Sequence, residues 1–232
     1  MNGPPPDERP GNAPQASFVM VLPPGWVRLP ALATDRAELR ATIEVVVADA
    51  IPASLPRGSA EPWRGELRKR LGRAVLDAGD AGATAVYLPV RAVDGVIVPA
   101  SFIESELDYD GQDSAESIIA EIVGDPEWNA TRQTVDGSAA VRSDRSERRV
   151  QPDGDWPEVT TRQIVYTIDV PHREGRWVVL SFSAVSGDSP SSRLSDALVF
   201  LFDALVTTFR WTDVPGRDHS DLEIRLDEIH SR

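Results

Sequence analysis

The sequence predicts an α+β fold in which helices cover a largely antiparallel sheet. Strand-like segments follow one another across short links rich in turn residues, which favours hairpins. Helical patterns lie between groups of strands, whereas a doubly wound parallel fold would alternate strand and helix. Hydrophobic residues make up 41% of the 232 residues, which is enough for one packed core. We therefore expect a single domain over residues 17–212.

Both ends of the chain differ in composition from this domain. Residues 1–16 are rich in proline and poor in large apolar side chains, so we expect a disordered N-terminal tail. Residues 213–232 form an acidic C-terminal tail in which apolar residues recur at the spacing of a short amphipathic helix. The N-terminus lacks the apolar core of a secretory signal, and no apolar run approaches the roughly 20 residues of a membrane span. We expect a cytoplasmic protein without membrane insertion.

The domain opens with two short strands followed by two helices. Apolar residues 18–22 and 26–29 flank the turn-forming triplet Pro23-Pro24-Gly25. Helical spacing of apolar residues predicts one helix over 35–51 and a second over 59–79. The apolar face of the second helix is expected to consist of Trp63, Leu67, Leu71, Val75 and Leu76.

Two alternating segments in the middle of the chain, residues 84–90 and 96–107, are expected to form a hairpin. The Asp-Gly pair between them is a typical hairpin turn. Glu104 and Glu106 lie two residues apart and would share one face of the second strand. We interpret that face as the charged outer face of a half-buried strand.

The second half contains a short helix over 114–123, four more strands and the most strongly amphipathic helix of the chain. The first of its two hairpins alternates mostly polar residues and is expected at an exposed edge. Trp177 and Trp211 are expected in the core. The strands are predicted over 131–135, 139–148, 160–170 and 177–185, and the helix over 192–209.

Composition excludes several kinds of chemistry. The 24 Lys and Arg against 37 Asp and Glu give a formal net charge of −13, which argues against binding to nucleic-acid backbones. The absence of cysteine excludes disulfides, thiolate metal sites and cysteine nucleophiles. Three histidines, no phosphate-binding loop and no nucleophile elbow leave few routes to catalysis. We therefore expect no enzymatic activity, no cofactor and no bound metal.

One acidic cluster keeps a metal-dependent alternative open. Asp108, Asp110, Asp113 and Glu116 resemble a calcium-binding loop, but Ile119 stands where such a loop carries its bidentate glutamate. A polar turn whose aspartate caps the next helix is the simpler interpretation.

Four residues are candidates for contacts with a protein partner. Trp128 and Trp156 lie in turn-rich segments, and exposed tryptophans often anchor protein interfaces. Arg64 and Arg68 lie on the polar side of the second predicted helix and could meet an acidic surface. Charge and composition thus favour a protein partner over nucleic acid, and they leave the oligomeric state open.

The opening segment FVMVLPPGWVRL, residues 18–29, resembles the start of the PsbP-like superfamily. Pro23, Gly25 and Trp26 match the turn that joins its first two strands, and the closing hairpin and helix also fit, so the resemblance covers residues 17–211. The superfamily includes a photosystem extrinsic subunit, Ran-binding Mog proteins and Eag-type bacterial secretion chaperones. The resemblance implies an α/β/α sandwich, with an antiparallel sheet between helices, and a non-enzymatic binding role without catalytic residues.

These observations predict a non-enzymatic, protein-binding accessory or chaperone, associated with a bacterial secretion system. In the Eag-type comparison, the partner would lie as a helix in a groove of the sheet. Two alternatives remain: an acidic immunity-type inhibitor of a basic toxin, and a metal-dependent enzyme that uses the carboxylates of residues 108–116.

Overall fold

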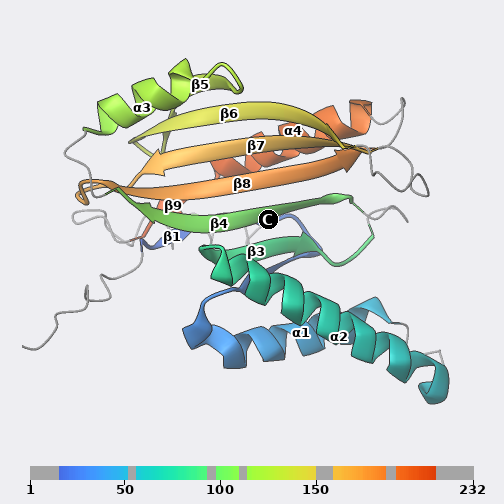
Figure 1. Cartoon of the computed structure of the whole chain (residues 1–232). Coiled ribbons are helices and arrows are strands. Elements are labelled where there is room, and N and C mark those ends of the chain that lie inside the picture. Colours follow the sequence, from blue (N-terminus) through green and yellow to red (C-terminus); the bar gives the residue numbers. More distant parts are fainter. Residues whose placement is uncertain are drawn as a thin grey trace, which may run out of the picture.

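The computed structural model describes residues 16–51, 56–92, 98–109, 114–149, 159–186 and 192–212. In these ranges, seven strands form an antiparallel sheet in the order β2-β3-β4-β8-β7-β6-β5 (Figure 1). This architecture confirms the α+β prediction. The elements are β1 (Phe18–Val19), β2 (Trp26–Pro30), the 3₁₀ turn η1 (Ala33–Asp35), α1 (Arg36–Ala50), α2 (Arg57–Asp80), β3 (Ala83–Pro89), β4 (Ala100–Asp108), α3 (Ala115–Gly124), β5 (Asn129–Val135), β6 (Ser138–Arg149), β7 (Val159–Asp169), β8 (Arg176–Ser186), α4 (Ser192–Thr207) and β9 (Arg210–Trp211).

Short turns between consecutive strands determine most of the strand order in the sheet. The predicted turn before β2 is present: Gly25 has φ +81°, and the Trp26 N–H donates to the Pro23 carbonyl at 3.2 Å. The hairpins β3–β4, β5–β6 and β7–β8 all pair antiparallel, and β5 is the predicted exposed edge. The pairing of β4 with β8 then joins the two halves of the sheet into one layer.

One face of the sheet is sealed by α4, which lies behind the strands in Figure 1. Its apolar stripe packs on alternate residues of the central strands. The ring of Phe202 stacks on that of Phe182, with centroids 4.6 Å apart, and Phe102 lies 5.7 Å away. Trp177 and Trp211 are both buried, as predicted. Trp211 belongs to β9, which pairs with β1, whereas Trp177 is buried on the other face of the sheet, in the core beneath α3. We call the side of the sheet that α4 covers the α4 face.

The other helices lie on the opposite face and cover only its two sides. Helix α1 packs on β2 and α2 on β3, whereas α3 packs on β5 and β6. Each group has its own small core, centred on Val47 and Val75 beneath α1 and α2, and on Ile119 and Val141 beneath α3. We call this side the open face, because the strands between the two groups carry no helix (Figure 1).

The structure corrects the predicted apolar face of α2. Trp63 and Leu76 are exposed, with 70% and 40% of their surface accessible, although both were expected on the buried side. Helix α2 has 24 residues against 15 in α1, and its first turns extend past the sheet (Figure 1). Val75, near the other end of the helix, is buried as expected.

Some predictions fall outside the described residues. These include residues 1–15 of the predicted N-terminal tail, the Asp-Gly turn between β3 and β4, and the C-terminal tail with its amphipathic segment. Among the helices that the structure describes, none has both the length and the apolar character needed to cross a membrane.

Candidate functional site

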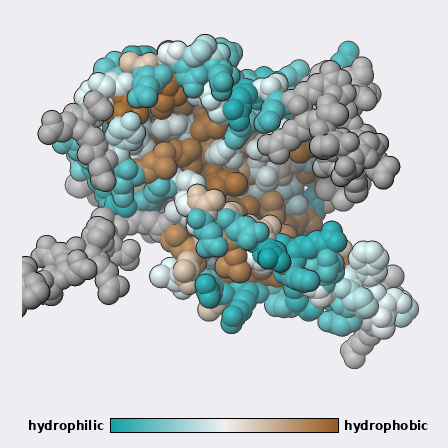
Figure 2. Space-filling model, viewed as in Figure 1, coloured by the Kyte–Doolittle hydropathy of each residue, from teal (hydrophilic) through white to brown (hydrophobic). Residues whose placement is uncertain are grey.

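The middle of the open face forms a groove between α1–α2 and α3. Its floor consists of the side chains of β4, β8 and β7 that point away from α4, and all of the floor residues defined below except Leu107 are half buried. Figure 2 shows hydrophobic residues exposed in this region, between the two helical groups. The floor comprises Ser101, Ile103, Ser105, Leu107, Gln163, Val165, Thr167, Val179, Ser181 and Ser183.

The dimensions of the groove match those of an α-helix. Three neighbouring strands at about 4.8 Å spacing give a floor roughly 10–15 Å wide, and a helix with its side chains is about 10–12 Å across. Strands β4, β7 and β8 have 9, 11 and 11 residues, so the floor is about 30–36 Å long. A helix of about 20 residues would fill it.

Aliphatic and hydroxyl side chains alternate across the floor. Along one row, Ile103 of β4 pairs with Ser181 of β8, which pairs with Val165 of β7. In the next row, Ser105 pairs with Val179. Val165 and Val179 belong to none of the three hydrophobic cores. Their exposed surface is therefore available for a contact with another molecule.

A pocket of about 560 Å³ opens at the α3 side of the groove. Leu107 and Tyr109 line it and are 51% and 44% exposed, so its mouth is apolar. Trp177 also lines it, and the buried indole N–H of Trp177 has no hydrogen-bond acceptor among the described residues. The pocket can take a bulky apolar side chain. Its other lining residues are Ile118, Glu121, Ile122, Gly124, Asp125, Trp128, Ser143, Val165 and Thr167.

A line of polar contacts runs from this pocket across the floor. The Arg145 guanidinium lies over the Trp128 ring, 4.4 Å from its centroid. Its Nη2 donates to Gln163 Oε1 at 3.1 Å, and Gln163 Nε2 donates to Ser181 Oγ at 3.2 Å. Three strands of the floor and wall are thus linked by side chains, which fixes the orientation of Gln163 and Arg145.

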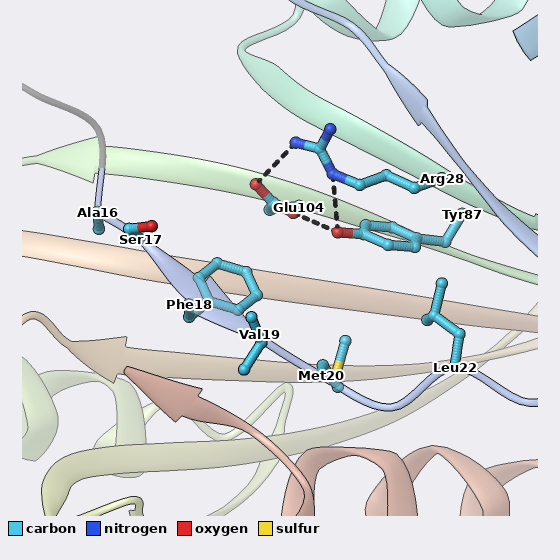
Figure 3. Close-up of a pocket in the computed structure, with 9 residues that line it drawn as sticks. All are labelled: Ala16, Ser17, Phe18, Val19, Met20, Leu22, Arg28, Tyr87 and Glu104. Carbon is cyan, nitrogen blue, oxygen red and sulfur yellow. Dashed lines mark hydrogen bonds and ion pairs between the residues drawn. The ribbon is translucent and has the colours of Figure 1, made fainter. Parts of the chain in front are cut away.

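A second pocket, of about 480 Å³, lies on the α4 face beneath the N-terminal segment 16–22 (Figure 3). Glu104 is buried there and accepts hydrogen bonds from Tyr87 Oη at 2.6 Å and Thr84 Oγ1 at 2.7 Å. Arg28 completes the cluster: its Nε donates to Tyr87 Oη at 3.2 Å, and its Nη2 lies 3.8 Å from Glu104. Burial and the neighbouring Glu104 raise the pKa of Tyr87.

The carboxylates of β4 hold the N-terminal segment in place. Glu106 accepts the Ala16 N–H at 2.8 Å and pairs with Arg176 at 3.2 Å. The prediction that Glu104 and Glu106 form a solvent-exposed outer face is therefore wrong, because the segment folds over them from 90 residues away in sequence. Since Glu104 is surrounded by donors from the protein itself, we interpret this pocket as structural.

The acidic cluster expected near Asp108 is only partly described. Asp108 pairs with Arg176 at 2.9 Å, and Glu116 pairs with Arg132. Asp110 and Asp113 lie outside the described residues. In the part of the chain that the structure describes, no three carboxylates or histidines come together as a metal site would require.

The four candidate partner residues do not form one surface. Trp128 lies at the edge of the groove, over Arg145. Arg68 pairs with Glu44 of α1 at 2.8 Å, which ties α2 to α1. Arg68 and Arg64 both pair with Glu61 within α2 itself. Trp156 lies outside the described residues. Whether any of the four contacts a partner stays a prediction.

Sequence reasoning missed the groove residues, although a signal was present. Ser181 and Ser183 lie in the most apolar strand of the sequence, and both are half exposed. In the middle of β7 and β8, large buried residues alternate with half-buried ones. The buried residues are Ile164, Tyr166, Ile168, Val178, Leu180 and Phe182, and the half-buried ones are Gln163, Val165, Thr167, Val179, Ser181 and Ser183. Such alternation is typical of a sheet with one open face.

Known proteins similar to this chain are found among solved structures. No family model matches the chain, and no curated protein matches it. Among solved structures, the Saccharomyces cerevisiae Ran-binding protein Mog1p is similar over 56% of this chain and 79% of that chain, with 19% identity and a TM-score of 0.36. A likeness at this level carries no conclusion about function, and membership of the PsbP-like superfamily stays a prediction.

Proposed function

We propose that the protein is a non-enzymatic accessory protein that binds an apolar helix of a partner protein in the groove of the open face. The observation that carries this proposal is the half-buried floor on β4, β8 and β7, which lies between two helical walls and has the width and length of one helix.

The chemistry of the floor favours a helix over other occupants. Val165, Val179 and Leu107 offer apolar contact, while the small Ser181 and Ser183 let a helix approach the sheet closely. A strand would add to a free sheet edge instead, and these central strands are paired on both sides. The length of about 20 residues equals that of a membrane-spanning helix.

Binding without catalysis fits the contacts of the charged groups. Glu104 is engaged by Tyr87 and Thr84, and Asp108 and Glu116 are in ion pairs with arginines. These carboxylates are therefore not arranged as an acid–base pair around a cavity.

The finer proposal is that of a chaperone that shields a client's apolar helix in the cytoplasm before secretion. Its secretion part rests on the resemblance of residues 17–211 to Eag-type chaperones. A gene for an exported protein with an apolar segment of about 20 residues beside this gene would support it. Recovery of such a client with the tagged protein from the native host would support it further.

The direct test uses a synthetic helix of about 20 Leu and Ala residues flanked by lysines. We expect it to bind and to raise the melting temperature of the protein, since a ligand that binds only the folded state stabilises it. Val179→Arg places a charge on the floor and should weaken binding at least about tenfold.

Val45→Arg is the matched control, because Val45 is 67% exposed on α1. It should leave the affinity unchanged. Equal affinity of the Val179→Arg and Val45→Arg variants, or no binding to the unmodified protein, would contradict the proposal.

A further inference from the structure

We infer that Arg145 binds a carboxylate side chain of the helix in the groove, and thereby fixes the helix in one register. This inference rests on the proposed function. It concerns the chemistry of the partner: an apolar helix that carries one Asp or Glu where it faces β6.

Arg145 differs from the other arginines on strands. The structure describes seven strand arginines with their side chains, and six of them lie within 4.0 Å of a carboxylate. Among the described residues, Arg145 has no such partner, although the chain carries a net charge of −13. The six paired arginines are Arg28, Arg132, Arg142, Arg162, Arg176 and Arg210.

The guanidinium of Arg145 is held in place before any partner arrives. Its flat face lies on Trp128, and Nη2 is fixed by Gln163 Oε1. The Nε atom is buried without an acceptor among the described residues. Stacking on tryptophan and one neutral hydrogen bond leave most of the charge uncompensated, so an anion would improve its interactions.

Its position places this charge at the wall of the groove. Arg145 pairs across β6–β7 with Gln163, and Gln163 pairs across β7–β8 with Ser183. All three side chains lie on the open face, in the row next to Ile103, Ser181 and Val165. A helix lying on β8 and β7 would therefore pass beside the guanidinium.

A carboxylate side chain fits this position better than a neutral group. An acidic residue in an apolar helix would be repelled by the excess negative charge of the chain unless a cation met it locally. Arginine offers a planar fork that matches a carboxylate, and its orientation here is already set. One charged contact in an otherwise apolar interface fixes the register of the bound helix, because any shift of the helix along the groove would leave both charges unpaired.

The test compares four apolar peptides of about 20 residues, each with a single Glu at one of four consecutive positions, with their Gln counterparts. Four positions span one helical turn, so one Glu faces β6 in the bound helix. We expect the best Glu peptide to bind the unmodified protein roughly tenfold more tightly than its Gln counterpart. In Arg145→Gln, this preference should disappear.

Arg132→Gln is the matched control, because Arg132 also lies on the open face but pairs with Glu116 of α3. It should keep the preference for Glu, and circular dichroism would verify that both variants fold. If Glu and Gln peptides bind equally, or if Arg145→Gln keeps the preference, the inference about Arg145 is contradicted, whereas the proposal that the groove binds an apolar helix is not. If no peptide binds, the proposed function and this inference fall together.

Discussion

At the scale of single residues, Asp169 shows what an uncompensated charge does in this fold. It is the last residue of β7, lies on the open face and pairs across the sheet with buried Trp177. Desolvation by burial raises the pKa of its carboxyl group above the ordinary 3.8. The charged form is therefore less favourable in the folded chain than in the unfolded chain.

We predict that Asp169→Asn stabilises the protein at neutral pH. Because the folded pKa is raised, the carboxylate destabilises the native state at every pH above that pKa. The penalty fades as the pH falls and vanishes below 3.8, where the group is protonated in both states. After screening by solvent, we expect a gain below about 1 kcal/mol at pH 7 and none in acid, measured by urea unfolding at both pH values.

Asp144→Asn is the control for Asp169→Asn, because the opposite effect on stability is expected. Asp144 pairs with Arg162 at 2.9 Å and with Arg142 at 3.5 Å, so its replacement should lower stability at pH 7. If Asp169→Asn instead lowered stability at pH 7, the carboxylate of Asp169 would have to make a favourable contact.

At the scale of elements, the place where α2 ends decides how the open face is divided. Gly79, one residue before the end of α2, lies against Ala31, the residue after β2: an added Cβ would stand 2.3 Å from the Ala31 carbonyl oxygen. Only glycine permits this approach, and the approach keeps α2 on one side of the sheet. The groove beside it exists because α2 packs on β3 and α3 mainly on β5 and β6, which leaves most of β8 uncovered on this face.

We predict that Gly79→Ala destabilises the protein by about 1–3 kcal/mol, because α2 must move away from Ala31. Gly65→Ala, in the same helix, is the control: an added Cβ there meets nothing within 4 Å. It should stabilise by roughly 0.5–1 kcal/mol through the higher helix propensity of alanine. Urea unfolding measures both changes in stability. Similar effects of the two variants would mean that the close approach to Ala31 does not require glycine at position 79.

The sequence predicts elements better than it predicts contacts between distant ones, and Glu104 shows why. Periodicity identified the strand that carries Glu104, because alternation is a local property. Its burial depends on segment 16–22, which returns over β4 from far away in the chain, and no local pattern encodes that. The same limit applies to the groove: the hydroxyls of β8 were visible in the sequence, but the positions of α2 and α3 beside them were not.

At the scale of the whole molecule, the two faces of the sheet have separate roles. The α4 face carries most of the aromatic packing, including Phe18 of β1, whose ring stacks on Phe209 with centroids 4.5 Å apart. The open face carries the groove, and Val165 on its floor contributes to no core. Both faces belong to the same strands, but successive side chains along a strand point to opposite faces. The side chains that pack on α4 are therefore separate from those that line the groove.

We therefore predict that stability and binding can be changed independently. Phe18→Ala should lower the free energy of unfolding by roughly 2–4 kcal/mol, because it removes the stacking on Phe209 and the edge contact with Trp211 at 6.1 Å. Well below its melting temperature, this variant should bind the apolar peptide with nearly unchanged affinity. Val165→Arg should show the reverse, with weakened binding and a smaller loss of stability, since its side chain can extend into the open groove. Calorimetry with the peptide and urea unfolding of both variants measure the two quantities. If Phe18→Ala weakened binding as much as Val165→Arg does, the groove would depend on the packing of the α4 face, and the separation would fail.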